Sequence, residues 1–178
     1  MRKKVLFISC MLLIVLAFGV IKYYNKDLSN KKVTIESKNE EEAKKIKAID
    51  FKLVDINGKE RTLSEFKGKK VFLNFWATWC GYCKTEMKDI QKLYDETKDK
   101  NIVILAVDVG ESKDKVKDFI DNNKYTFTVL LDKDQEITKA YGIQGFPTTL
   151  FIDEEGYVYS GIQGGMSIDT MRRELFLK

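Results

Sequence analysis

Two cysteines, Cys80 and Cys83, have the type and spacing for redox chemistry. Separated by two residues, they can close a small disulfide ring and open it again with little backbone movement. The apolar positions after Cys83, from Met87 to Tyr94, recur at helical spacing, so Cys80 is expected at a helix start and Cys83 one turn inside. The positive end of a helix favours thiolate, which makes Cys80 the expected nucleophile and Cys83 the shielded, resolving thiol.

Two other interpretations of this pair are open: two buried cysteines without chemistry, or half of a zinc site. A zinc site would need further ligands. The chain has no histidine, and its third cysteine, Cys10, lies far away in an apolar segment. We therefore favour redox chemistry, predict no metal site, and expect no cofactor other than a redox-active Cys80–Cys83 disulfide.

Buried strands must position the two thiols. The apolar run 71–76 predicts a strand buried on both faces that ends just before the cysteines, and residues 101–109 predict a second one. Residues 113–122 form an amphipathic segment, so a β-α-β crossover is expected. The remaining elements are expected at 51–54 and 60–62 around the Asn57-Gly58 turn, 126–131, 135–141, 148–153, 157–161 and 167–177.

The segment FWATWCGYCK at 75–84, with GFPTT at 145–149, resembles the thioredoxin superfamily. Within it, the chain is most similar to membrane-anchored TlpA/ResA-like thiol-disulfide oxidoreductases, from about Phe51 to the C-terminus. The resemblance implies an α/β, thioredoxin-like fold: a central mixed sheet flanked by helices, with an N-terminal β-hairpin extension. It also implies that the protein is a thiol-disulfide oxidoreductase.

The resemblance further implies a substrate-binding surface around the thiols, formed by Trp79, Gly81, Tyr82, Phe146 and Pro147. The Phe146–Pro147 bond is expected to be cis and to lie against the cysteines, with the Phe146 backbone available to an extended substrate segment. A purely structural interpretation of this proline is also open, because it stands at a strand start, where its missing N–H is tolerated.

Two residues bear on proton transfer. Thioredoxins place an acid in the central strand behind the thiols, but this chain has Asn74 there, which cannot titrate. Glu86, three residues after Cys83, is similar to the glutamate that TlpA/ResA-like proteins carry, and it is our third candidate catalytic residue. The alternative is a surface glutamate that interacts with the helix N-terminus.

The N-terminal residues 1–24 combine three basic residues, an apolar run at 5–21 and the flanking sequence Lys22-Tyr23-Tyr24, which predicts a membrane anchor. The basic residues place the N-terminus in the cytoplasm, so the expected location is a single-pass protein of the bacterial cell membrane with its catalytic domain outside. A cleavable signal peptide remains open. Residues 25–49 are polar and predict a tether, and residues 50–178 form the expected domain.

Composition and resemblance together suggest the biological role. A net charge of +4, with lysines interleaved among acids, gives no support for nucleic-acid binding. The resemblance suggests reduction of disulfides in exported proteins, apocytochrome c among them, with electrons from a membrane donor of CcdA or DsbD type. The absence of histidine between the cysteines favours a reductant. A thiol oxidant or isomerase, and a non-catalytic binding module, are the alternatives.

Overall fold

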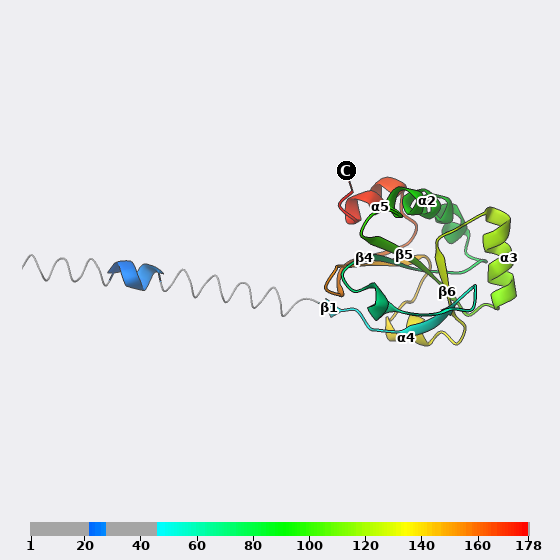
Figure 1. The fold of residues 1–178 in the computed structure, drawn as a ribbon, viewed down its shortest axis with the longest axis horizontal. Helices are drawn as coiled ribbons and strands as arrows, with labels where there is room; N and C mark the ends of the chain where they lie inside the picture. Colours follow the sequence, from blue (N-terminus) through cyan, green and yellow to red (C-terminus); the bar gives the residue numbers. More distant parts are fainter. Residues whose placement is uncertain (1–21, 28–45, 178) are drawn as a thin grey trace, which may run out of the picture. The chain divides into compact units, whose positions relative to one another are not determined.

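A computed structural model describes residues 22–27 and 46–177 of the chain (Figure 1). Residues 22–27 are helical, and the folded unit begins at Ile46. The predicted membrane segment at 5–21 and most of the predicted tether lie outside the described residues. Within the described ranges, no helix is both long and apolar enough to cross a membrane.

In the described part of the chain, eight strands form one mixed sheet in the order β1-β8-β7-β4-β5-β6-β2-β3. The neighbours β4, β5 and β6 are parallel, and all other pairs are antiparallel. This arrangement confirms the expected α/β class with a central mixed sheet. The strands are β1 (Ile46–Lys47), β2 (Lys52–Asp55), β3 (Glu60–Thr62), β4 (Lys70–Trp76), β5 (Ile102–Val109), β6 (Thr128–Asp132), β7 (Thr148–Ile152) and β8 (Tyr157–Gln163).

Helices cover both faces of this sheet, and Figure 1 shows α2 and α5 on one side and α4 on the other. The first face packs against α2, α3 and α5 through a core that includes Phe72, Met87 and Val116. The opposite core includes Phe75 and lies towards α4 and the short 3-10 helix η1. The helices are α2 (Gly81–Thr97), α3 (Lys113–Asn123), α4 (Glu136–Ala140), α5 (Ile168–Glu174) and η1 (Leu63–Phe66).

The central strand β4 is apolar on both faces because it lies between these two cores. It pairs in parallel with β5 and antiparallel with β7, so it has no edge exposed to water. Phe72, Phe75 and Trp76 are each completely buried. A strand fixed on both sides and both faces gives the turn that follows it a rigid starting point.

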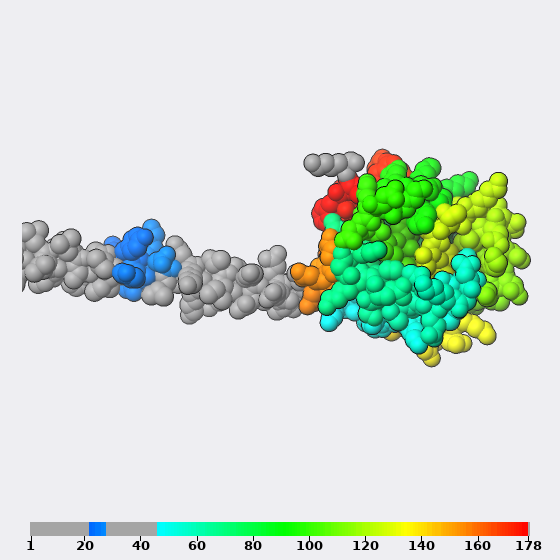
Figure 2. Space-filling model, in the orientation of Figure 1, coloured from blue at the N-terminus to red at the C-terminus, as the bar shows by residue number. Residues whose placement is uncertain are grey.

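The N-terminal part of the folded unit extends the sheet at both edges. Strands β2 and β3 pair antiparallel, and Gly58 in their turn has φ 88°, a conformation that glycine adopts without strain. Because β2 also pairs with β6, this hairpin continues the main sheet; Figure 2 shows the segment, in cyan to teal, on the molecular surface. Strand β1 lies within the range predicted as tether. Its two residues are too few to show an alternating pattern in the sequence, and they form a strand by pairing with β8.

Candidate active site

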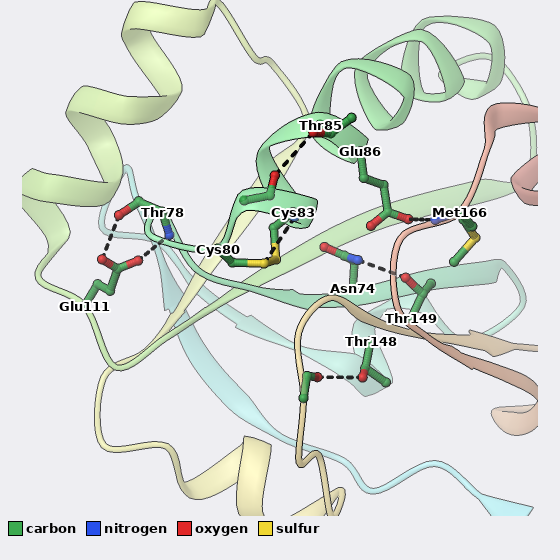
Figure 3. Close-up of a disulfide and its surroundings, with 12 residues drawn as sticks. Asn74, Thr78, Cys80, Cys83, Thr85, Glu86, Glu111, Thr148, Thr149 and Met166 are labelled. Atoms are coloured by element: carbon green, nitrogen blue, oxygen red, sulfur yellow. Dashed lines mark hydrogen bonds between the residues drawn. A yellow bond between two sulfur atoms is a disulfide. The ribbon is translucent and has the colours of Figure 1, made fainter.

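A disulfide joins Cys80 and Cys83 where β4 passes into α2, with Cα atoms 5.2 Å apart (Figure 3). Cys80 is the N-cap residue of α2, and its Sγ accepts a hydrogen bond of 3.1 Å from the backbone N–H of Cys83. The N-terminal N–H groups of a helix have no partners within the helix, so a sulfur at the cap can take one of them. This geometry favours negative charge on Cys80 when the disulfide is open.

Both sulfurs are shielded in the disulfide form. Cys83 is 1% exposed and Cys80 6% exposed, so Cys83 lies slightly deeper, in the expected order. The two residues belong to the same apolar core as Trp76 and Met87. The distinct roles that we predict for the two thiols remain predictions, because a closed disulfide does not distinguish attacking from resolving sulfur.

Two exposed aromatic residues adjoin the cysteines in the chain. Trp79 is 63% exposed and Tyr82 is 78% exposed, unusual values for such large side chains. The Trp79 ring contacts the ring of Phe146 edge-on at 5.9 Å between centroids. The Phe146–Pro147 peptide bond is cis, as expected, and the carbonyl of Pro147 accepts a hydrogen bond of 2.7 Å from Gly164 N–H. These residues, together with Gly81 at the first position of α2, come from two distant parts of the chain.

Glu86 is buried, with only 3% of its surface exposed. Its Oε1 accepts a 3.3 Å hydrogen bond from the backbone N–H of Met166, which lies between β8 and α5, while Oε2 has no partner among the described residues. Burial raises the pKa of Glu86 to about 7, the bond from Met166 opposes this rise, and the nearby charge of Asp89 adds to it. The alternative of a surface glutamate is therefore wrong, because the 164–166 loop covers this side chain.

The chain is similar to several known proteins. A model of the AhpC/TSA family matches residues 45–160. The thiol-disulfide oxidoreductase ResA of Geobacillus kaustophilus is 41% identical over 72% of this chain and 74% of its own length, and ResA of Bacillus subtilis is 38% identical over 93% and 89%. The crystal structure of the pneumococcal exposed lipoprotein thioredoxin Etrx1 of Streptococcus pneumoniae has a TM-score of 0.65 at 32% identity and covers 72% of this chain and all of that one.

This chain belongs to the AhpC/TSA family of the thioredoxin superfamily. The predicted family and fold are confirmed, and so is the predicted class of enzyme, a ResA-like thiol-disulfide oxidoreductase with a CxxC pair. In this family member the cysteines, the cis proline and the exposed aromatic rings meet at one end of the sheet.

Asn74 occupies the β4 position at which thioredoxins place an acid. Its side chain is 1% exposed, and its Nδ2 donates a 2.8 Å hydrogen bond to Thr149 Oγ1 on the neighbouring strand β7. Asn74 Oδ1 has no partner within the described part of the chain. The position behind the thiols is therefore polar but cannot titrate, as the sequence indicates.

Sequence analysis missed a second buried acid, Asp108, near the end of β5. Its side chain is completely buried, and neither of its oxygens meets a hydrogen-bond donor among residues 22–27 and 46–177. Burial, and then the adjacent Glu111 carboxylate, raise the pKa of Asp108 to about 8. A signal was present in the sequence, since residues 101–109 predict a doubly buried strand and Asp108 is its one acid.

Glu111 connects this acid to the turn that carries the cysteines. Its Oε1 accepts a 2.7 Å hydrogen bond from Thr78 Oγ1 and forms an ion pair with Lys115, while Oε2 accepts from the Thr78 backbone N–H. Burial opposes its charge, but the Lys115 and Thr78 bonds outweigh burial and lower the pKa of Glu111. No group of three or more His, Cys, Asp or Glu side chains placed to bind a metal ion occurs in the described ranges.

Proposed function

We propose that this protein reduces disulfides in exported proteins on the extracytoplasmic side of a bacterial membrane. The observation that carries the proposal is the buried Cys80–Cys83 disulfide at the N-cap of α2, with the exposed Trp79 and Tyr82 next to the two cysteines in the chain. A reversible disulfide needs a stabilised thiolate, and a protein substrate needs an exposed apolar surface beside it. Both features occur at this one position.

The proposed reaction is a two-electron exchange. The Cys80 thiolate attacks one sulfur of a substrate disulfide, and the substrate's other sulfur leaves as a thiolate that takes up a proton. Cys83 then loses its proton and attacks Cys80 Sγ, which releases the second substrate thiol and closes the Cys80–Cys83 disulfide. The substrate is reduced and the enzyme is oxidised by the same two electrons. The Cys83 N–H, 3.1 Å from Cys80 Sγ, would stabilise the attacking Cys80 thiolate.

Glu86 is the proposed proton carrier of this exchange. A buried carboxyl with a pKa of about 7 can take up or give a proton at neutral pH, and Glu86 lies one turn of α2 beyond Cys83. Its Oε2, without a partner in the described structure, is open to a proton. Figure 3 shows Glu86 and Met166 on the side of the disulfide opposite Thr78 and Glu111.

The proposed substrate surface consists of Trp79, Gly81, Tyr82, Phe146 and Pro147. Trp79 and Tyr82 supply apolar area, and the backbone of Phe146 would pair with an extended substrate segment that carries the disulfide. Main-chain pairing accepts many sequences, so these aromatic rings provide most of the selectivity. Apocytochrome c and oxidised surface proteins are the proposed clients, by analogy with ResA-like proteins.

The proposed location is a single-pass membrane protein with a cytoplasmic N-terminus. Residues 1–24 would form the anchor, residues 25–49 the tether, and the catalytic domain would lie outside, within reach of a membrane electron donor of CcdA or DsbD type. The apolar run at 5–21, the preceding basic residues and the likeness to Etrx1, described as an exposed lipoprotein thioredoxin, support this proposal. Before treatment, the catalytic domain should sediment with the membranes. Protease added to intact spheroplasts should then digest it, and full protection would contradict this location.

A redox titration tests the direction. No histidine lies between the cysteines, so one source of thiolate stabilisation found in strong oxidants is missing. Thioredoxin has a potential of about −270 mV, and the oxidant DsbA about −120 mV. We expect a midpoint more negative than about −180 mV; a more positive value would assign the protein as an oxidant or isomerase.

Two cysteine variants provide the matched controls. Cys80→Ser should abolish disulfide reduction, whereas Cys83→Ser should accumulate mixed disulfides with substrate at Cys80. If reduction persists in Cys80→Ser, the assigned nucleophile is wrong. If the intact pair shows no exchange with any protein disulfide, the remaining function is that of a binding module.

A further inference from the structure

Asp108 is a buried acid that the thiol exchange above does not use. Along β5 it shares the face of Ile104 and Ala106, which pack in the core with α2 and α3, and the β4–β5 register pairs it with Trp76. Neither Asp108 oxygen meets a donor in the described part of the chain. A buried carboxylate without a donor is costly, so a compensating arrangement is required.

Glu111 supplies that arrangement. Two adjacent buried carboxyl groups cannot both ionise at low cost, so one keeps a proton and donates it to the other. The hydrogen bonds from Thr78 and Lys115 keep Glu111 charged, while burial and the charge of Glu111 keep the proton on Asp108. The pair therefore carries one proton and one negative charge at neutral pH.

Few charged groups compete for this proton. The loop after β5 presents Glu111, and α3 presents Lys115, whose Nζ lies 2.5 Å from Glu111 Oε1. The strands on either side pair Trp76 and Leu131 with Asp108, and neither is ionisable. From α2 and its cap, the ionisable side chains at this core are Tyr94, the buried Glu86 and the thiols of the reduced pair. Tyr125, which follows α3, lies in the same core. Of the charged groups that act on Asp108, Glu111 has the largest effect, and the thiols would respond to ionisation of Asp108 through the turn that Glu111 holds.

Glu111 in turn holds the segment that precedes the nucleophile. It accepts hydrogen bonds from both the backbone N–H and the hydroxyl of Thr78, two residues before Cys80. We propose that Asp108 and Glu111 share one proton and that this proton holds the 78–80 turn in the position in which Cys80 reacts. The pair is a positioning device for the thiol exchange proposed above and acts on Cys80 through Thr78.

Loss of the shared proton has a defined consequence. Two negative carboxylates repel each other, Glu111 moves towards Lys115 and solvent, and the Thr78 N–H loses its acceptor. The new buried charge also disfavours thiolate at Cys80. Cys80 should therefore react more slowly at alkaline pH than a single titrating thiol would.

The test is the pH profile of Cys80 alkylation by iodoacetamide in the reduced full chain carrying Cys83→Ser, quantified on the Cys80 peptide by mass spectrometry. This background should show two transitions, with a rate at alkaline pH below the single-thiol curve. Adding Asp108→Asn, which keeps a donor to Glu111, should leave one transition and raise the alkaline rate roughly three- to tenfold. Superimposable profiles would overturn the proposal.

Two further variants sharpen the result. Glu111→Gln keeps an oxygen for Thr78 but removes the charge, so the second transition should move to lower pH. Asp114→Asn, the same change at an exposed position of α3, should leave both transitions in place. An unmoved second transition in Glu111→Gln would contradict the sharing of a proton.

The readout separates this inference from the proposed function. Alkylation needs no partner protein, so two transitions without any disulfide reduction would support the inference and reject the function. Disulfide reduction by the protein, together with an alkylation profile that Asp108→Asn does not change, would support the function and reject the inference. If Asp108→Asn fails to fold, the test is an NMR titration of the Asp108 carboxyl in the unmodified chain. A midpoint near 8 would support the proposal, and a midpoint near the ordinary value of 3.8 would overturn it.

Discussion

Glu86 and Asp108 are two buried carboxyl groups near one disulfide, and they are kept from ionising in different ways. Glu86 accepts one backbone hydrogen bond, from Met166, and desolvation is the main cause of its raised pKa. Asp108 accepts none within the described structure and lies against a second carboxyl, Glu111. Figure 3 shows Met166 on one side of the cysteines and Glu111 on the other.

The difference separates two uses of a buried acid. Glu86 titrates as a single group near neutral pH, so it is suited to carrying a proton during the reaction. Asp108 titrates as part of a pair, and its proton is linked through Glu111 and Thr78 to the backbone ahead of Cys80. The thioredoxin position filled here by Asn74 thus has two buried acids nearby, one on α2 and one on β5.

The largest expected effect is on stability, in Asp108→Asn. The folded-state pKa of Asp108 is raised from 3.8 to about 8, so the unfolded chain releases this proton first. The free energy of unfolding should therefore fall as pH rises from about 4 to 8 and then level off. Asp108→Asn should match the unmodified oxidised protein near pH 4 and exceed it by about 3–6 kcal/mol at pH 8, measured by urea unfolding. If the variant and the unmodified protein were equally stable at pH 4 and also at pH 8, the raised pKa of Asp108 would be contradicted.

A smaller effect of the same sign is expected for Glu86→Gln. The pKa of Glu86 is raised from 4.5 to about 7, so the unmodified protein loses stability across that window and the variant does not. The expected gain at pH 8 is about 2–3 kcal/mol in urea unfolding. Glu136→Gln, at an exposed position of α4, is the matched control. Disulfide reduction should slow in Glu86→Gln, and unchanged kinetics and pH profile would leave Glu86 without a part in the reaction.

The link from Glu111 to the cysteine turn is tested by Thr78→Val. Valine keeps the shape and the backbone N–H but removes the hydroxyl that donates 2.7 Å to Glu111 Oε1. The expected loss is about 1 kcal/mol of unfolding free energy at neutral pH. Thr85→Val removes an exposed 3.3 Å bond to the Gly81 carbonyl and should cost less. If the two variants lost the same unfolding free energy, the Thr78–Glu111 hydrogen bond would contribute no more than an exposed one.

The smallest effect separates the two acids. Asp89 raises the pKa of Glu86 through its charge but does not affect Asp108. Asp89→Asn should therefore move the Glu86 titration to lower pH by a few tenths of a unit. NMR titration of both carboxyl groups measures this, and an equal shift of Asp108 would show that the two sites are coupled.

Much of the fold and part of the site follow from local sequence. The apolar run of β4, the cysteine pair at the helix start and the residues of the GFPTT segment indicate their structures within a few positions. Asn74 likewise follows from its place in the strand. The element ends differ by up to three residues, as in β6 (Thr128–Asp132) against the expected 126–131 and α5 (Ile168–Glu174) against 167–177, because terminal residues pair and pack according to their neighbours in the fold.

The amino-acid sequence by itself determined the chemistry, because the spacing of Cys80 and Cys83 and the helix they begin are local properties. Only the tertiary structure decided the environment of the acids. Glu86 is buried because a loop 80 residues away covers it, and Asp108 keeps its proton because Glu111 is held by Thr78, 33 residues before it. Desolvation depends on everything that packs around a group, and no local pattern specifies that packing.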